Sequence, residues 1–182
     1  MTWKHVLQIT VSAVAMLLAS GAARADSKAE IDVGVASAMS RFYAQDPANR
    51  ELARKAAGVL VFPHITKGGV GIAGEYGEGA LLVGGHPVAY YSIGAASVGA
   101  TVGVGQRSEV LLFMTREALD GFRKSQGWTV GADAQVAVVS KGAGAQYDNE
   151  TLRKPILAFV FGEKGLIGDL SIEGAKITMK AT

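Results

Sequence analysis

The sequence has 182 residues, with 18 Lys and Arg against 16 Asp and Glu, and it contains no cysteine. The lack of cysteine excludes disulfides and thiolate metal sites. The small basic excess disappears if residues 1–25 are removed, because Lys4 and Arg24 leave with them and 16 residues of each sign remain. A nearly neutral chain carries no electrostatic signal for nucleic acid.

Residues 1–25 have the features of a cleaved signal peptide. Lys4 and His5 precede an apolar run from Val6 to Ala19, and the Ala-Arg-Ala sequence at 23–25 fits a cleavage site. The run is short for a membrane anchor and lacks a stop-transfer flank. We expect export to the periplasm or cell envelope, with a mature single domain of residues 26–182 and no spanning helix.

The expected mature chain begins with an amphipathic helix from Ser27 to Gln45. Its apolar residues recur at helical spacing and are Ile31, Val35, Met39 and Phe42. The polar face carries as many acidic as basic residues, whereas helices that lie on membranes are rich in Lys and Arg. This balance favours a helix docked on the protein's own sheet over one that lies on lipid.

A second, short helix is predicted over 48–57, with Asp46 as its N-cap and Pro47 at its first position. It contributes to the densest positive group of the mature chain, which consists of Arg50, Arg54, Lys55 and, further on, Lys67. Such a group is either a ligand-binding patch or an ordinary solvated helix face.

The segment from Gly58 to Gly105 dominates the chain. Residues 68–105 hold 12 of the 24 glycines, and apolar residues alternate with them. In the period of a strand, each strand then has one apolar face and one nearly bare face. A bare face allows another backbone, a helix or a ligand to come close, and it favours kinks and bulges. We expect a strongly curved sheet or partial barrel, and we favour the first helix as the element that covers the bare faces.

The remaining elements predict an α+β fold with a mainly antiparallel sheet, N-terminal helices and one inserted helix. The apolar run 110–114 indicates a strand buried on both faces, and Thr115 is positioned to cap a helix that stops at Gly127. The further expected strands are 128–139, 141–147, 156–161 and 166–172, with a turn at 162–165, and an edge strand that contains Ile177 and Met179.

The motifs for cofactors, metals and catalysis are weak. The GxGxxG sequence at 69–74 is followed neither by a helix start nor by a suitably placed acid, so we expect no nucleotide cofactor. His64 and His86 have no second histidine at ligand spacing, and no metal site is expected. Glu75 and Glu78 are either an acid-base pair or charges that protect a hairpin edge, and the latter is favoured. We therefore expect no catalytic residues and no enzyme activity.

Ordered blocks of sequence over nearly the whole expected mature chain resemble the SYLF domain family. The blocks are AAGVLVFP at 56–63, KGGVGI at 67–72, GEYGEGAL at 74–81, YYS at 90–92, VLLFMT at 110–115, GW at 127–128, FVFGEKGL at 159–166 and EG at 173–174. The resemblance implies a lipid-binding module. Eukaryotic members bind phosphoinositides and some bind actin, whereas bacterial relatives are exported and many look like lipoproteins.

Carried over to this chain, the resemblance implies that phospholipid, or a membrane surface, is the partner. The residues implied are the helix side chains Ile31, Val35, Met39 and Phe42 and the bases Arg50, Arg54, Lys55 and Lys67. The chain has no lipobox cysteine, so the association would be noncovalent. The alternatives are an envelope protein-protein interaction or scaffold module, and an enzyme with Glu75 or His64 in a deep pocket. The oligomeric state stays open.

Overall fold

The structure is a computed structural model that describes residues 26–140, 149–165 and 172–181, without the side chains of 70–73, 97–103, 140, 149 and 163–165. The expected signal peptide and the expected strand 141–147 lie outside the described residues, as does most of 166–172. The elements are α2 (Lys28–Gln45), α3 (Pro47–Lys55), β1 (Gly58–Val83), β2 (His86–Phe113), α4 (Arg116–Lys124), β3 (Trp128–Thr129), β4 (Ala137–Ser140), α5 (Asn149–Leu152), β5 (Ile156–Gly165) and β6 (Lys176–Met179).

The two N-terminal helices both begin at capping residues. The Ser27 hydroxyl accepts from the Glu30 amide, and the Glu30 carboxylate accepts from the Ser27 amide, which completes a capping box at the start of α2. Asp46 caps α3 by accepting from the Ala48 amide, with Pro47 at the first helical position. Both predicted helices are confirmed.

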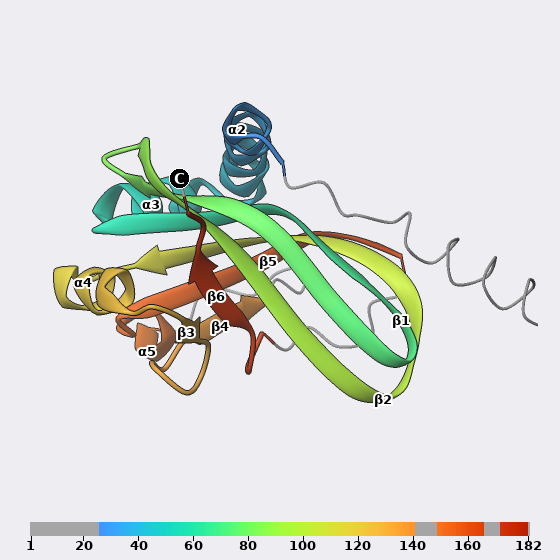
Figure 1. Cartoon of the computed structure of the whole chain (residues 1–182). Helices are drawn as coiled ribbons and strands as arrows, with labels where there is room; N and C mark the ends of the chain where they lie inside the picture. Colours follow the sequence, from blue (N-terminus) through green and yellow to red (C-terminus); the bar gives the residue numbers. More distant parts are fainter. Residues whose placement is uncertain (1–25, 141–148, 166–171, 182) are drawn as a thin grey trace, which may run out of the picture.

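The glycine-rich segment forms one very long antiparallel hairpin, made of β1 and β2. Its turn is Gly84-Gly85, where both residues have positive φ angles that glycine adopts readily. The hairpin bends back on itself, so that the two halves of β1 approach one another (Figure 1). A Cβ on Gly79 would lie 2.0 Å from the Val61 carbonyl oxygen, which no side chain could tolerate.

This contact corrects the expected role of the bare strand faces. Where side chains are described, the bare face at Gly77 and Gly79 is covered by the backbone of His64 and Val61 in the first half of β1, and not by a helix. The helix uses a glycine of its own for close approach, because a Cβ on Gly34 would lie 3.0 Å from the Pro63 side chain. The expected bare faces within 70–73 and 97–103 lie outside the described side chains.

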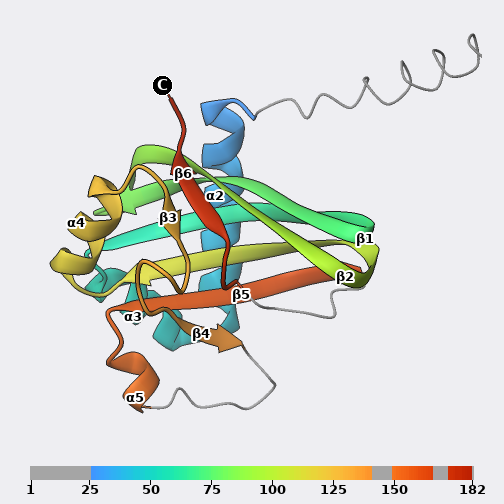
Figure 2. The same ribbon diagram turned by 60° about the horizontal axis from the view of Figure 1, so that its bottom comes forward.

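The strands form one curved sheet with the order β3-β6-β2-β5-β4, and β1 pairs with β2 beside this path. All described pairings between these strands are antiparallel except that of β4 with β5. Helix α2 crosses one face of the sheet, while α4 lies at one end of it (Figure 2). Apolar side chains form one core beneath α2 and a second core on the other face, which includes Phe122 and Trp128. The α+β class with a curved, mainly antiparallel sheet is confirmed.

Three predicted element boundaries are wrong. Strand β5 continues through the expected turn at 162–165, because Gly162, with a φ of 68°, lies where the β2–β5 register shifts and the chain stays paired beyond it. The expected strand 128–139 is divided into β3 and β4 by a turn at 131–133. Helix α4 ends at Lys124 and not at Gly127, and its C-cap is Ser125, whose hydroxyl donates to the Phe122 carbonyl.

Two further differences concern the C-terminal part of the chain. Strand β6 is an interior strand, since it pairs with β2 on one side and with the two-residue β3 on the other. The short helix α5 was not predicted, because its four residues are too few to show a helical period.

Candidate functional site

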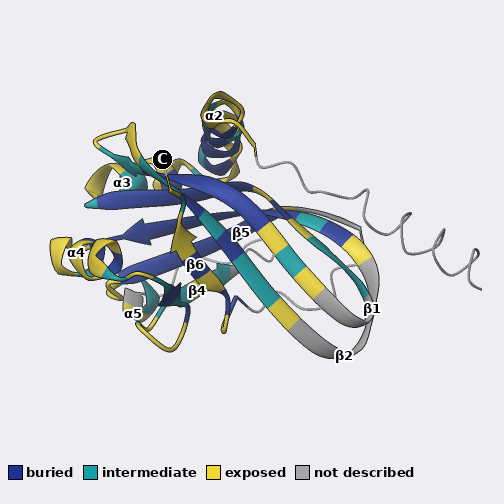
Figure 3. Ribbon diagram, viewed as in Figure 1, coloured by how far each residue is buried: buried dark blue, intermediate teal, exposed yellow. Residues whose placement is uncertain are grey.

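The apolar stripe of α2 is buried against the sheet. Ile31, Val35, Met39 and Phe42 are all at most 7% exposed, and they pack on β1, β2 and β5 within the core beneath the helix (Figure 3). The prediction of a helix docked on its own sheet is confirmed. In this conformation the four side chains predicted to contact lipid contact the sheet, so contact of the buried stripe with lipid would require α2 to leave it.

Polar contacts along α2 reinforce the docking. The Arg41 guanidinium donates to the Ser108 hydroxyl at 3.1 Å and lies over the Phe161 ring at 5.7 Å. Near the start of the helix, the Tyr90 hydroxyl donates to the Asp32 carboxylate at 3.0 Å. Two charged residues of the polar face, Asp32 and Arg41, thus bind to β2 and β5.

A groove opens between the C-terminal half of α2, α3 and the β1–β2 turn, and we call it the α2–α3 groove. Its volume is about 490 Å³. Its apolar and neutral lining consists of Met39, Tyr43, Ala53, Ala56, Gly58, Val59, Leu82, Gly84 and Gly85, and its charged lining consists of Arg50 and Arg54. The arrangement combines an apolar surface with two cations, which suits an amphiphile with an anionic head.

The aromatic ring of Tyr43 helps to position the cationic part of the groove. The Arg50 guanidinium lies 4.5 Å from the centre of this ring, within the range of a cation–π contact. Burial raises the pKa of the Tyr43 hydroxyl, so the ring stays neutral beside the arginine. Tyr43 was not among the predicted site residues, because an aromatic residue next to Phe42 gives no local sign of a contact with Arg50, seven positions further on.

The four predicted bases do not form one group. Arg50 and Arg54 line the groove, while Arg54 and Lys55 both pair with Glu51 on exposed surface of α3, at 2.8 and 3.4 Å. Lys67 lies in β1, where its amine is 3.3 Å from Glu75 and its side chain is only 12% exposed. Lys67 is therefore part of a different cluster.

That second cluster is a buried set of charges between β1 and β2. The Arg107 guanidinium, 1% exposed, lies 2.7 Å from the Glu75 carboxylate and 3.8 Å from the Glu109 carboxylate. The longer distance exceeds a hydrogen bond, and neither oxygen of the fully buried Glu109 accepts one. Burial raises the pKa of Glu109 to about 7, although Arg107 opposes the rise. The apolar pattern of 110–114 gave no sign that Glu109 would be enclosed as well.

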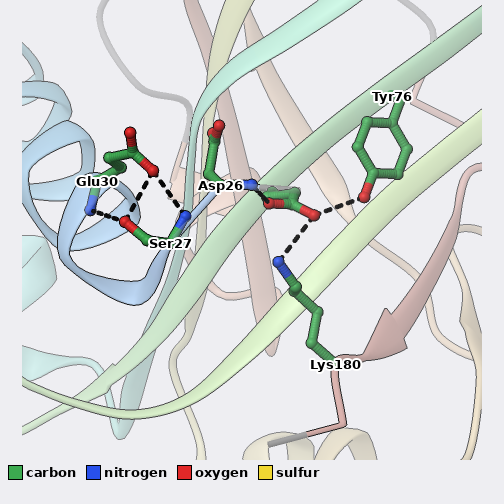
Figure 4. Close-up of polar contacts among 6 residues, drawn as sticks. Asp26, Ser27, Glu30, Tyr76 and Lys180 are labelled. Atoms are coloured by element: carbon green, nitrogen blue, oxygen red, sulfur yellow. Dashed lines mark hydrogen bonds and ion pairs between the residues drawn. The ribbon is translucent and has the colours of Figure 1, made fainter. Parts of the chain in front are cut away.

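A third cluster surrounds Glu78, whose side chain is 4% exposed. Its carboxylate accepts from the Tyr76 hydroxyl at 2.6 Å and from the Asp26 backbone amide at 2.8 Å, and it pairs with Lys180 at 2.8 Å (Figure 4). Glu75 and Glu78 therefore have separate partners on separate sides of β1. They are neither an acid-base pair nor exposed charges at a hairpin edge, and the edge interpretation is wrong.

The remaining candidates for chemistry lie apart. His64 and His86 are both exposed, and His64 lines a shallow cavity with Tyr76 and Glu78. Within the described part of the chain, no three His, Asp or Glu side chains are grouped so that they could hold a metal ion. Across those same residues, none of the helices is both long and apolar enough to cross a bilayer.

Comparison with known families gives one match. The model of the Ysc84 family, described as "Las17-binding protein actin regulator", matches residues 94–182, about half of the chain. The match includes the sequence blocks at 110–115, 127–128, 159–166 and 173–174, while the α2–α3 groove lies upstream of it. No curated protein matches the chain.

Proposed function

Residues 94–182 of this chain belong to the Ysc84 (SYLF) family, and from this premise we propose that the protein is an exported, non-enzymatic phospholipid-binding protein. We assign binding to the α2–α3 groove. The observation that carries the proposal is the pairing of Arg50 and Arg54 with an apolar wall in one open groove. Export rests on the signal-peptide features of residues 1–25.

The groove matches the two parts of a phospholipid at its interface. The guanidinium group of Arg50 offers several N–H donors in a planar fork, which suits the oxygens of a phosphate. Arg54 donates from Nε and Nη2 to Glu51, and it adds a second cation beside Arg50. Met39, Val59 and Leu82 provide an adjoining apolar surface for the first carbons of an acyl chain. The groove is within the size range of small-molecule sites, so it takes a head group and the start of a chain.

The proposal keeps α2 docked and reassigns part of the predicted lipid-binding set. Met39, Arg50 and Arg54 contact the ligand, Lys55 adds charge beside the groove, and Ile31, Val35 and Phe42 hold the helix in place. Lys67 supports the buried cluster in β1. Each base near an anionic surface contributes roughly 1 kcal/mol, so the two arginines together change affinity by about 10- to 30-fold.

Vesicle binding tests the proposal directly. We expect residues 26–182 to sediment with vesicles that contain phosphatidylglycerol, more strongly at low than at high salt, and weakly with vesicles of phosphatidylcholine alone. The double variant Arg50→Gln/Arg54→Gln should weaken binding by about 10- to 30-fold. Its matched control is Arg123→Gln/Lys124→Gln, which removes the same charge from the exposed end of α4.

The control separates a site from a general charge effect. Equal losses in the two double variants would show that binding follows net charge and would remove the groove from the proposal. Failure to bind any anionic vesicle at low salt would remove the lipid function. Recovery of one stoichiometric protein partner without lipid would then favour the envelope scaffold alternative.

A further inference from the structure

The Glu78 cluster lies where the predicted signal-peptide cleavage would create a new chain end. Asp26 is the first residue after the expected cleavage site, and its backbone nitrogen is 2.8 Å from Glu78 Oε2. Ser27, the next residue, is fixed by the capping box of α2. The nitrogen of Asp26 is thus held against a buried carboxylate from a rigid helix start, and not by a chance contact of a loose tail.

Three separate parts of the chain contact the Glu78 carboxylate, namely Asp26 before α2, Tyr76 in β1 and Lys180 after β6. Tyr76 and Glu78 come from β1, and Lys180 follows β6, where its own amide donates to the Tyr90 carbonyl at 2.9 Å. Tyr76 and Lys180 both bind Oε1 of Glu78, so the Asp26 nitrogen has Oε2 to itself among these contacts (Figure 4). A cavity of about 300 Å³ that Asp26 and Glu78 help to line gives a larger nitrogen group room and access to water.

The two oxygens of Glu78 have partners of different kinds while residues 1–25 are attached. Oε1 has the Lys180 amine, a cation, at 2.8 Å. Tyr76, on the same oxygen, stays neutral, since burial raises its pKa to about 12 with the help of Glu78 and Asp26. The partner of Oε2 is the Asp26 backbone amide, which is a neutral donor. Among these contacts, Oε2 therefore has a hydrogen bond but no cation.

We propose that Glu78 is the binding site for the protein's own processed amino terminus. Hydrolysis by a signal peptidase breaks the C–N bond between Ala25 and Asp26. Water gives its hydroxyl to the Ala25 carbonyl carbon and a hydrogen to the Asp26 nitrogen, which takes up one more proton and becomes an ammonium group. The neutral amide contact with Glu78 Oε2 becomes an ion pair, which fastens the start of α2 to β1. This inference rests on the cleavage that the proposed function includes.

Two forms of the chain that differ by one residue provide the test. One begins at Asp26 and the other at Ala25, so that both keep the Asp26 N–H but only the first places an ammonium group on it. We expect the form that begins at Asp26 to unfold at a temperature roughly 2–6 °C higher. The same comparison in the Glu78→Gln background should give no difference. Equal midpoints with Glu78 present, or a difference that persists with Gln, would overturn the proposal.

A second variant keeps the test decisive if Glu78→Gln does not fold. Lys180→Gln removes the cation that competes for Glu78, so the difference between the two forms should grow, and an unchanged or smaller difference counts against the proposal. The mass of the exported protein tests the premise separately, and a mature chain that begins elsewhere would overturn the biological role. Vesicle binding does not enter either measurement, so failure of lipid binding is distinguishable.

Discussion

Glu109 shows how one enclosed side chain sets the pH range in which the fold is most stable. It lies in β2 with no exposed surface and no hydrogen bond to its carboxylate. Because burial raises its pKa from 4.5 to about 7, the folded protein holds a proton that the unfolded chain releases between these values. The stability of the protonated form is therefore present at low pH and is lost as the pH rises through about 7.

Replacement of Glu109 by glutamine should remove this loss. We expect Glu109→Gln to be more stable than the wild type at pH 8, by on the order of 3 kcal/mol, and to differ little at pH 4.5. Arg107 keeps its contact with Glu75 in the variant. Urea unfolding at several pH values measures the effect, and a wild type whose stability is flat between pH 5 and 8 would contradict it.

At Gly79 the bent β1–β2 hairpin leaves no room for a side chain. A Cβ there would collide with the Val61 carbonyl oxygen, which belongs to backbone and cannot rotate away. We expect Gly79→Ala to lower the free energy of unfolding by at least about 2 kcal/mol. Gly74→Ala is the matched control in the same strand, because nothing lies within 4 Å of its Cβ position. Similar losses in both variants would mean that strand propensity, and not close approach, accounts for the glycines.

At the level of elements, the proposed lipid binding requires α2 to stay packed on the sheet, and a cross-link between α2 and β1 can test this. The chain has no native cysteine, so an engineered pair is unambiguous. A Cβ on Gly34 would lie 3.1 Å from the Pro63 Cβ, a few tenths of an ångström short of the usual separation of about 3.5–4.5 Å in a disulfide. Cysteines at these two positions would tie the helix to β1.

We expect oxidised Gly34→Cys/Pro63→Cys to bind anionic vesicles as well as the reduced form does. The groove is complete with α2 docked, so the cross-link takes nothing from it. Binding that disappears on oxidation and returns with reductant would show the reverse, namely that Ile31, Val35 and Phe42 must leave the core to reach the bilayer. Sedimentation with and without reductant on one preparation decides between the two.

The elements that could be predicted from sequence are those with local signals. The helical spacing of apolar residues identified α2, capping residues identified the starts of α3 and α4, and the apolar run 110–114 identified the buried end of β2. The predicted boundaries at Gly127 and at 162–165 are wrong because glycine marks turns, helix ends and bulges alike, and only strand pairing distinguishes them. In the same way, the doubling of the β1–β2 hairpin depends on contacts between Gly79 and Val61, which are distant in sequence.

The candidate site was predictable only in part for the same reason. Arg50 and Arg54 could be chosen from their density on α3, but Lys67 was grouped with them by sequence proximity alone and belongs to Glu75. The role of Arg41 was hidden because its partner Ser108 is 67 positions away. A charge pattern in the sequence indicates which charged residues share a helix face. It does not show which of these residues will bind to a neighbouring strand.

At the scale of the whole molecule, the balance of charge limits how the protein can recognise a surface. With residues 1–25 removed, acidic and basic residues are equal in number, so long-range attraction to an anionic membrane is weak. Any preference for anionic lipid must come from the local group on α3. The salt dependence of binding therefore reports two or three charges and not the overall field, which makes the comparison of α3 and α4 variants informative.

The α2–α3 groove depends on the bend of the β1–β2 hairpin, because both ends of β1 line it. One wall of the groove contains Gly58 and Val59 from the first residues of β1, and another contains Leu82 with the Gly84-Gly85 turn from its far end. If β1 and β2 were paired near their turn but the hairpin had not bent back, these two walls would not lie side by side. Affinity for a ligand in the groove therefore requires the bent hairpin, and a bound ligand would stabilise the folded protein against partial opening of this hairpin.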